Sequence, residues 1–185
     1  MHFWMRIASR EVRRWCTNSA GPGMSDALAI VQTWATEHEL TAAAAGDGSL
    51  SVVVPGSQRL RIPVVFTHTP QALVIESFVM RATDEDATAV HAFMLQRNSK
   101  AFGIAYAIDA SRDVYLVGRI PLASLSVDIV DQYVGNLVSM ADGDFNRLLE
   151  LAYPEAIARE WRWRLSRGEP TENLAAFPHL RPDVI

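Results

Sequence analysis

The sequence predicts a fold of the α+β class, in which a β-sheet carries helices. Two observations support this class. Between Val64 and Pro121 the spacing of apolar residues changes from every second residue to every third or fourth and back again, which is typical of strands, a helix and further strands. Two further stretches with helical spacing, residues 25–39 and 126–141, lie on either side of this block. We therefore expect residues 64–121 to form the centre of the domain.

The size and composition suit one globular domain. The chain has 185 residues, of which 49% are hydrophobic and 21% are charged, so it can bury a substantial core. No apolar run approaches the roughly 18 residues that a membrane-spanning helix needs. Cys16 is the single cysteine, which excludes a disulfide within the chain. A cytoplasmic location is the expectation.

The charge is distributed unevenly. Residues 1–23 hold four arginines against one glutamate, and subtracting this surplus of +3 from the net charge of −4 leaves −7 on residues 24–185. Such acidity disfavours nucleic acid as a partner and favours a basic protein. Residues 1–23 read either as an extension upstream of a natural start at Met24 or as a basic amphipathic membrane anchor carrying Phe3, Trp4, Ile7 and Trp15. The first interpretation is preferred, so membrane binding is not expected.

The first half of the domain reads as a helix followed by strands. Ser25 and Asp26 can cap the helix over residues 25–39. Residues 40–45 and 50–54 form a predicted hairpin, whose Asp-Gly turn supplies a positive φ. In the next strand, residues 60–66, Leu60 is expected to face the core and Arg59 the solvent, and Pro63 indicates an edge or a bulge. Residues 73–80 are apolar on both faces and predict a central strand buried on both sides.

The second half alternates again between helix and strand. Thr83 begins a capping-box sequence, so a helix is expected to follow it directly, with Val90, Phe93 and Met94 against the sheet. Strands follow at residues 104–108 and 114–120. Helices are predicted from Ser126 to residue 141, again from residue 145 and over residues 155–167. Residues 168–185 contain three prolines and read as an extended tail.

Motifs for catalysis or metal binding are missing or incomplete. His38-Glu39 begins a zinc-protease motif, but Ala42 stands where the second histidine is needed. Asp142 and Asp144 resemble the start of a calcium loop, but Arg147 occupies the position that requires glycine, so a restart of the helix is the better interpretation. We therefore predict no catalytic residue, no metal and no cofactor.

Glu76 and Arg119 form a candidate polar site on the sheet. Glu76 lies within an apolar strand, and Arg61, Arg81 and Arg119 belong to neighbouring segments. An ion pair across strands is the simplest interpretation. The alternative is a small-ligand site or an enzyme of unrecognised mechanism, in which the glutamate acts as a general base at the bottom of a pocket.

Two apolar stripes are candidate surfaces for a protein partner or a second copy of the chain. The first lies on the helix over residues 126–141 and consists of Val127, Val130, Val134 and Leu137. It can form a homodimer face or pack on the sheet of its own chain. The second is Trp161 and Trp163 in a segment rich in arginine, where Trp161 shares a helical face that docks while the arginines face solvent.

Residues 62–121 resemble the YbjN domain family. The resemblance rests on Pro63-Val64, LVIESFVMRA from Leu73 to Ala82, FMLQRNSKAFGIAYAID from Phe93 to Asp109, and VYLVGRIPLASLS from Val114 to Ser126. A weaker similarity spans residues 24–167, which sets expected boundaries of 1–23 for the extension, 24–167 for the domain and 168–185 for the tail. The basic first segment and the proline-rich end depart from the family pattern.

The resemblance implies a fold similar to type III secretion chaperones, with an antiparallel sheet of about five strands in the order α-β-β-β-α-β-β-α. It also implies a non-enzymatic role, because such chaperones bind segments of partner proteins and are usually acidic dimers. The expected function is therefore a protein-binding module, chaperone-like or regulatory, with an unknown protein partner and a possible homodimer.

Overall fold

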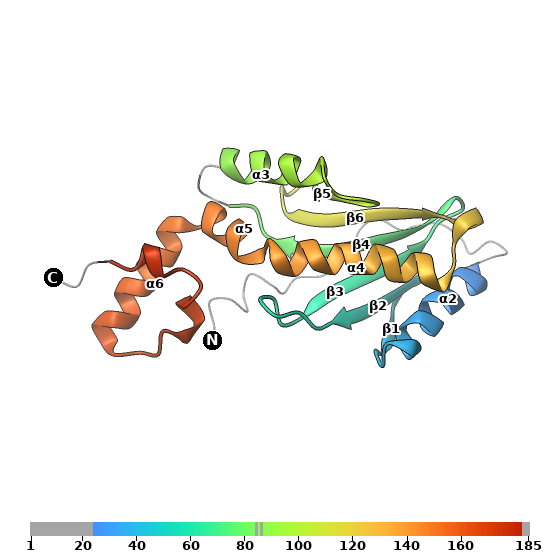
Figure 1. Ribbon diagram of the computed structural model, residues 1–185, viewed down its shortest axis with the longest axis horizontal. Helices are drawn as coiled ribbons and strands as arrows, with labels where there is room; N and C mark the ends of the chain where they lie inside the picture. The colour runs from blue at the N-terminus through green and yellow to red at the C-terminus, as the bar shows by residue number, and fades with distance from the viewer. Residues whose placement is uncertain (1–23, 84, 86, 183–185) are drawn as a thin grey trace.

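The computed structural model describes residues 24–83, 85 and 87–182, and within them the chain forms a six-stranded antiparallel sheet. The strands are β1 (Ala42–Gly46), β2 (Ser49–Val54), β3 (Ile62–His68), β4 (Ala72–Met80), β5 (Ile104–Ile108) and β6 (Val114–Pro121). Their order is β1-β2-β3-β4-β6-β5, so β1 and β5 are the edge strands (Figure 1). The α+β class is confirmed, with one strand more than the expected five or so.

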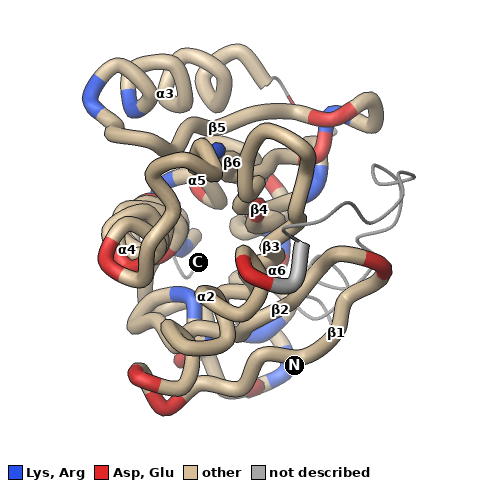
Figure 2. The backbone as a smooth tube through the Cα atoms, turned by 90° about the vertical axis from the view of Figure 1, so that its right-hand side faces the viewer, with Lys and Arg blue, Asp and Glu red and all other residues tan. Residues whose placement is uncertain are grey.

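Five helices accompany the sheet in the described residues: α2 (Met24–Glu37), α3 (Thr88–Asn98), α4 (Val127–Gly143), α5 (Phe145–Ala152) and α6 (Pro154–Arg167). Short 3-10 turns cover Leu122–Ser124, Glu172–Leu174 and Pro178–Leu180. Helices α2 and α4 lie side by side on one face of the sheet, and α3 lies beside β5 (Figures 1 and 2). Helices α5 and α6 continue from the end of α4 away from the sheet (Figure 1).

The main core lies between the sheet and the pair α2 and α4. We call this side of the sheet the helix face. Trp34 of α2 and Leu137 of α4 are fully buried there. The strands contribute alternate residues, among them Val52, Ile62, Val64, Phe66, Leu73, Ile75, Leu116 and Ile120. Burial of each large apolar side chain stabilises the fold by roughly 1.5–3 kcal/mol.

The opposite side of the sheet, which we call the open face, carries the other alternate residues. The strand register places Val65, Glu76, Val117 and Ala105 in one row across β3, β4, β6 and β5. Glu76 and Val117 are half-buried and Ala105 is exposed. The central position predicted for β4 is confirmed, but only its helix face is fully buried, because none of the described helices packs on the open face (Figure 2).

The beginning of β3 differs from the expectation. Leu60 is 75% exposed, whereas Arg59 is 8% exposed, so the predicted roles of these two residues are reversed. The regular alternation starts only at Ile62, after the turn. Pro63 pairs with β2, and β3 pairs with β4 only from Val65 onward. The strand is therefore internal, but Pro63 lies in a part of it that has a neighbour on one side alone, where a missing N–H is tolerated.

Helix α3 begins later than the capping box predicted. Its first residue is Thr88, and the N-cap residue before it, Ala87, makes no side-chain capping bond. The Thr83 hydroxyl instead accepts a hydrogen bond from the Glu85 N–H at 3.0 Å and donates one to the Ala152 carbonyl. Asp84 and Asp86, which also belong to the capping-box sequence, lie outside the described residues. Val90 and Met94 are buried and Phe93 is partly buried, as expected.

The C-terminal residues fold back instead of extending. Leu174 and Phe177 are buried with Leu149, Ile157 and Trp161 in a second, smaller core. The indole N–H of Trp161 donates to the Phe177 carbonyl at 3.0 Å, which fixes this return. The expectation of an extended tail is therefore wrong for residues 168–182, because Leu174 and Phe177, which lie between the prolines, pack against α5 and α6.

Candidate functional site

The outer edge of β1 is the most accessible strand edge of the described sheet. The strand has the sequence AAAAG, and its residues from Ala43 to Gly46 are exposed. It pairs with β2 on one side, and no strand of the described residues lies on its other side. Strand edges expose unpaired N–H and C=O groups, which many proteins protect with charged side chains or proline. None of these residues is charged or proline, so nothing in the strand itself hinders the addition of another one.

The opposite edge, β5, is closed by a side chain. The Asn98 carboxamide accepts a hydrogen bond from the Tyr106 N–H at 2.7 Å and donates one to the Tyr106 carbonyl at 3.1 Å. Because ladder bonds alternate along antiparallel strands, these two groups of Tyr106 are the ones that point away from β6. Asn98, the last residue of α3, therefore occupies the place of a peptide group from an added strand.

The predicted polar pair, Glu76 and Arg119, lies on the open face. Glu76 is opposite Val117 and Arg119 is opposite Val74, so the two residues are diagonal neighbours on β4 and β6. Neither side chain forms a hydrogen bond or an ion pair with a described residue, and the expected cross-strand ion pair is therefore not present. Partial burial raises the pKa of Glu76, and the charge of Arg119 opposes this shift only in part.

A pocket that converges on Glu76 and Arg119 is required if the pair is to bind a small ligand. A cavity among the described residues is lined by Phe78, Arg81, Ser111 and Asp113, and it includes neither residue of the pair. Asp113 is also occupied, because its carboxylate accepts a hydrogen bond from the Ala82 N–H at 2.8 Å. Within the described residues, no group of three or more His, Cys, Asp or Glu side chains is arranged to hold a metal ion.

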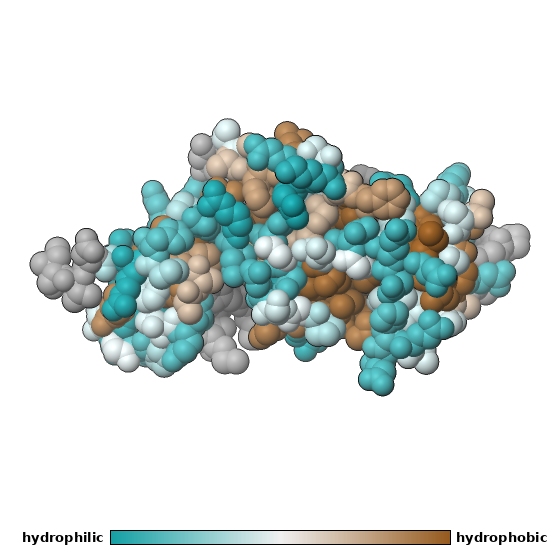
Figure 3. All heavy atoms as spheres, viewed as in Figure 1, coloured by the Kyte–Doolittle hydropathy of each residue, from teal (hydrophilic) through white to brown (hydrophobic). Residues whose placement is uncertain are grey.

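The apolar stripe of α4 packs mainly inside the chain. Val130, Val134 and Leu137 are at most 3% exposed and belong to the main core, so they are not available to a partner in the folded chain. The helix pairs its apolar side with the sheet, which was the alternative to a dimer face. Val127 is only partly buried. Figure 3 shows apolar residues reaching the surface at the end of the molecule where α4 begins.

The two tryptophans of α6 separate into one buried and one exposed residue. Trp161 is 5% exposed and fills the second core, as its predicted docking role requires. Trp163 is 43% exposed and is flanked by the guanidinium groups of Arg164 and Arg167, at 5.9 and 5.2 Å from its ring. Of the six residues predicted as a partner surface, Val127 and Trp163 are thus the ones that remain accessible.

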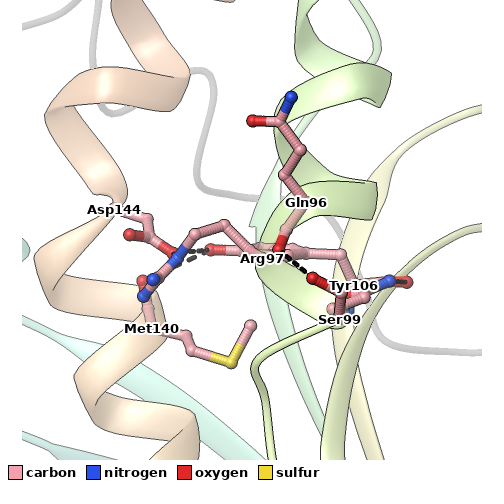
Figure 4. Close-up of polar contacts among 7 residues, drawn as sticks. Gln96, Arg97, Ser99, Tyr106, Met140 and Asp144 are labelled. Atoms are coloured by element: carbon pink, nitrogen blue, oxygen red, sulfur yellow. Dashed lines mark hydrogen bonds and ion pairs between the residues drawn. The ribbon is translucent and has the colours of Figure 1, made fainter.

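Sequence reasoning missed a buried polar network between α3, β5 and the junction of α4 and α5 (Figure 4). The Asp144 carboxylate accepts from the Arg97 Nε at 2.7 Å and from the Tyr106 hydroxyl at 3.1 Å. Burial, and then the nearby Asp144 charge, raise the pKa of Tyr106 well above its usual value. The sequence signal was the Asp-Gly-Asp break after α4, which was read only as a restart of the helix.

A second aspartate at this break, Asp142, organises the turn before β3. Its carboxylate accepts from the Ser57 hydroxyl at 2.6 Å, the Gln58 N–H at 2.8 Å and the Arg59 N–H at 2.7 Å. Desolvation alone would raise the pKa of Asp142, but the bonds from Ser57 and the backbone outweigh it and lower this pKa to about 2. Gly56 is needed here, since a Cβ at this position would lie 2.6 Å from the Asp142 carboxylate.

Comparison with known proteins places the described domain in a known group. The model of the YbjN family, described as "Putative bacterial sensory transduction regulator", matches residues 27–150. Uncharacterized proteins of Mycobacterium bovis and Mycobacterium tuberculosis are 40% identical over 162 residues, which cover 88% of this chain and 87% of theirs. One from Mycobacterium leprae is 42% identical over 139 residues, 74% of this chain and 76% of its own.

Three solved structures have a similar fold. The HopA1-SchA chaperone-effector complex gives a TM-score of 0.52 at 14% identity, covering 68% of this chain and 97% of that one. The ExsC-ExsE complex gives a TM-score of 0.53 at 17% identity, covering 68% of this chain and 95% of that one. The ExoU-SpcU complex from the type III secretion system of Pseudomonas aeruginosa gives a TM-score of 0.51 at 17% identity, covering 68% of this chain and 99% of that one. At such identities the likeness concerns the fold, and the predicted chaperone-like fold is confirmed.

Proposed function

This chain belongs to the YbjN family, and on that premise we propose that it is a non-enzymatic protein-binding module, chaperone-like or regulatory, which takes up an extended segment of a partner protein as an added strand on β1. The observation that carries the proposal is the difference between the two sheet edges. The β1 edge is exposed and uncharged, whereas Asn98 occupies the β5 edge. Strand addition uses main-chain hydrogen bonds for affinity, so it needs such a free edge.

The composition of β1 suits a variety of partner sequences. Its side chains are methyl groups, which leave room beside the strand for larger side chains of an added segment. The net charge of −7 on residues 24–185 favours a partner segment that contains lysine or arginine. Chaperone complexes with a similar fold are consistent with a role in holding partner segments.

The test places a photoreactive cross-linking residue at Ala45 of the full chain in cells, with Ala110, in the turn between β5 and β6, as the control. Both positions are exposed. We expect a recurrent protein cross-linked through position 45 and not through position 110. A synthetic peptide from the cross-linked region is then expected to bind the purified full chain in a saturable way.

A variant with Ala43→Lys and Ala45→Lys adds charge to the edge and is expected to weaken peptide binding at least about tenfold, because edge lysines oppose strand pairing. Ala110→Lys serves as the matched control and leaves binding unchanged. Equal binding by the wild type and the double variant contradicts strand addition at β1. The absence of any specific cross-link at position 45 contradicts the proposal as well.

The homodimer stays a prediction, with Val127 and Trp163 as its accessible candidate residues. Light scattering over a range of protein concentrations tests the homodimer, and a molar mass that stays at the monomer value throughout contradicts this prediction. The cytoplasmic location also stays a prediction, and no helix among the described residues is long and apolar enough to cross a membrane. A ligand or catalytic site at Glu76 and Arg119 receives no support from the described cavity, so we propose no second function.

A further inference from the structure

Arg59, in the turn before β3, is a buried cation for which the described residues provide no anion. The residue is 8% exposed, and its Nη1 atom is buried without a hydrogen-bond partner. A guanidinium group carries five N–H donors. The contact recorded for this group is with the ring of Phe145, whose centroid lies 5.5 Å from the guanidinium carbon. An aromatic face offers some attraction to a cation but accepts no strong hydrogen bond.

The carboxylates of this region are already engaged elsewhere. Asp142 accepts hydrogen bonds from the backbone of Arg59 and Gln58 and from the Ser57 hydroxyl, but none from the Arg59 guanidinium. Asp144 is paired with Arg97 and also accepts from the Tyr106 hydroxyl. Arg97 therefore has its counter-ion among the described residues, whereas Arg59 has none there.

Buried charges in proteins are nearly always paired, because removal of a lone ion from water is unfavourable. Burial lowers the pKa of Arg59 to about 10, and the nearby Tyr106 opposes this shift only in part. The group nevertheless remains charged at neutral pH. Among the described residues, Arg59 is therefore a buried, charged guanidinium group without a paired carboxylate.

We propose that Arg59 is the anchor of a binding site for a single oxyanion group, either a carboxylate or a phosphate. Both present two oxygens that match the planar fork of a guanidinium group. The flanking residues Gln58 and Leu60 are exposed, which places the site close to solvent. Nη1 itself has no contact with solvent, so binding of the oxyanion to this atom requires a movement of the guanidinium group. This site is independent of strand addition at β1.

The first test measures thermal unfolding of the full chain in sodium phosphate, sodium acetate and sodium chloride at equal ionic strength. Arg59→Gln removes the cation, and Arg61→Gln is the matched control, since Arg61 is exposed two residues further on. We expect phosphate, acetate or both to raise the unfolding midpoint of the wild type and of Arg61→Gln by about 3 °C over chloride near saturation, and to leave Arg59→Gln unchanged. The comparison of phosphate with acetate identifies which oxyanion the site accepts.

Equal shifts in wild type and Arg59→Gln overturn the proposal, because they indicate a general effect of the salt. The absence of a shift in all three proteins also overturns it. If Arg59→Gln does not fold, a titration of the wild type replaces that comparison. The backbone amide signals of residues 57–60 and 145 are then expected to move in a saturable way with phosphate or acetate and not with chloride. No saturable movement in these signals rejects the site.

Discussion

The turn before β3 is held by one carboxylate, so Asp142→Ala is the substitution whose cost can be worked out most directly. Three donors lose their acceptor: the Ser57 hydroxyl, the Gln58 N–H and the Arg59 N–H, at 2.6, 2.8 and 2.7 Å. A hydrogen bond to a charged group contributes about 1.5–3 kcal/mol. Ser57 and Gln58 are exposed and regain water, whereas the Arg59 N–H is partly buried and does not regain it fully.

We therefore expect Asp142→Ala to lower the free energy of unfolding by about 2–3 kcal/mol, which corresponds to a melting temperature about 5–10 °C lower for a chain of this size. Urea unfolding followed by circular dichroism measures the change. Asp128→Ala is the matched control, because this exposed aspartate lies on the same helix; its effect through the helix dipole is expected to stay within about 1 kcal/mol.

The pH dependence gives an independent check on the same carboxylate. The pKa of Asp142 in the folded chain is lowered to about 2 from the ordinary value of 3.8. The unfolded chain therefore binds the proton more readily, and the stability from this group is present above about pH 4 and lost as the pH falls toward 2. The difference in free energy of unfolding between wild type and Asp142→Asn should shrink below about pH 4. A difference independent of pH, or a decrease of less than about 0.5 kcal/mol in the free energy of unfolding for Asp142→Ala, refutes this reasoning.

Three further substitutions test other parts of the structure. Glu76→Gln is expected to raise the free energy of unfolding at neutral pH, because burial raises the pKa of Glu76 and its ionisation therefore opposes folding. This gain in stability should disappear below about pH 4, and a lower stability of the variant at pH 7 contradicts this view. Asn98→Ala should cost about 1–3 kcal/mol in urea unfolding and speed hydrogen exchange at the Tyr106 amide, whereas unchanged exchange shows that the carboxamide does not close the edge. Gly118→Ala should destabilise the chain by about 1–3 kcal/mol, since its Cβ would lie 2.8 Å from the Gly103 carbonyl oxygen and 2.4 Å from the Ile104 side chain; a melting temperature equal to that of the wild type argues against such tight packing.

The parts of the fold that the sequence predicted are those with local causes. The Asp-Gly turn requires a positive φ, and Gly48 has a φ of 69°. Ser126 was expected to cap α4, and its hydroxyl accepts from the Ile129 N–H at 3.3 Å. The break between α4 and α5 falls at Asp144, within the predicted Asp-Gly-Asp sequence. In each case the preference is encoded within a few residues, so neither the sheet nor the core can shift it far.

The features that the sequence did not predict depend on contacts between residues that lie far apart in the chain. Arg59 alternates with apolar residues and looks solvent-exposed, but Asp142 binds its backbone from 83 residues away and fixes the turn so that Leu60 points outward. The Thr83 hydroxyl likewise donates to the Ala152 carbonyl, 69 residues away, and α3 begins only at Thr88. No pattern within a short window contains these partners. The accessible candidates, Val127 and Trp163, could not be separated from their buried neighbours for the same reason.

The two sheet edges show how this limit affects the functional interpretation. Asn98 lies in the segment from Phe93 to Asp109 that carries the family resemblance, but its role depends on α3 ending opposite Tyr106. If α3 were displaced by a single residue, the carboxamide would turn by about 100° around the helix axis, because an α-helix has about 3.6 residues per turn. The β5 edge would then be open. Whether the β5 edge is free for strand pairing is thus controlled by where α3 ends, whereas the alanine strand β1 has no comparable cover among the described residues.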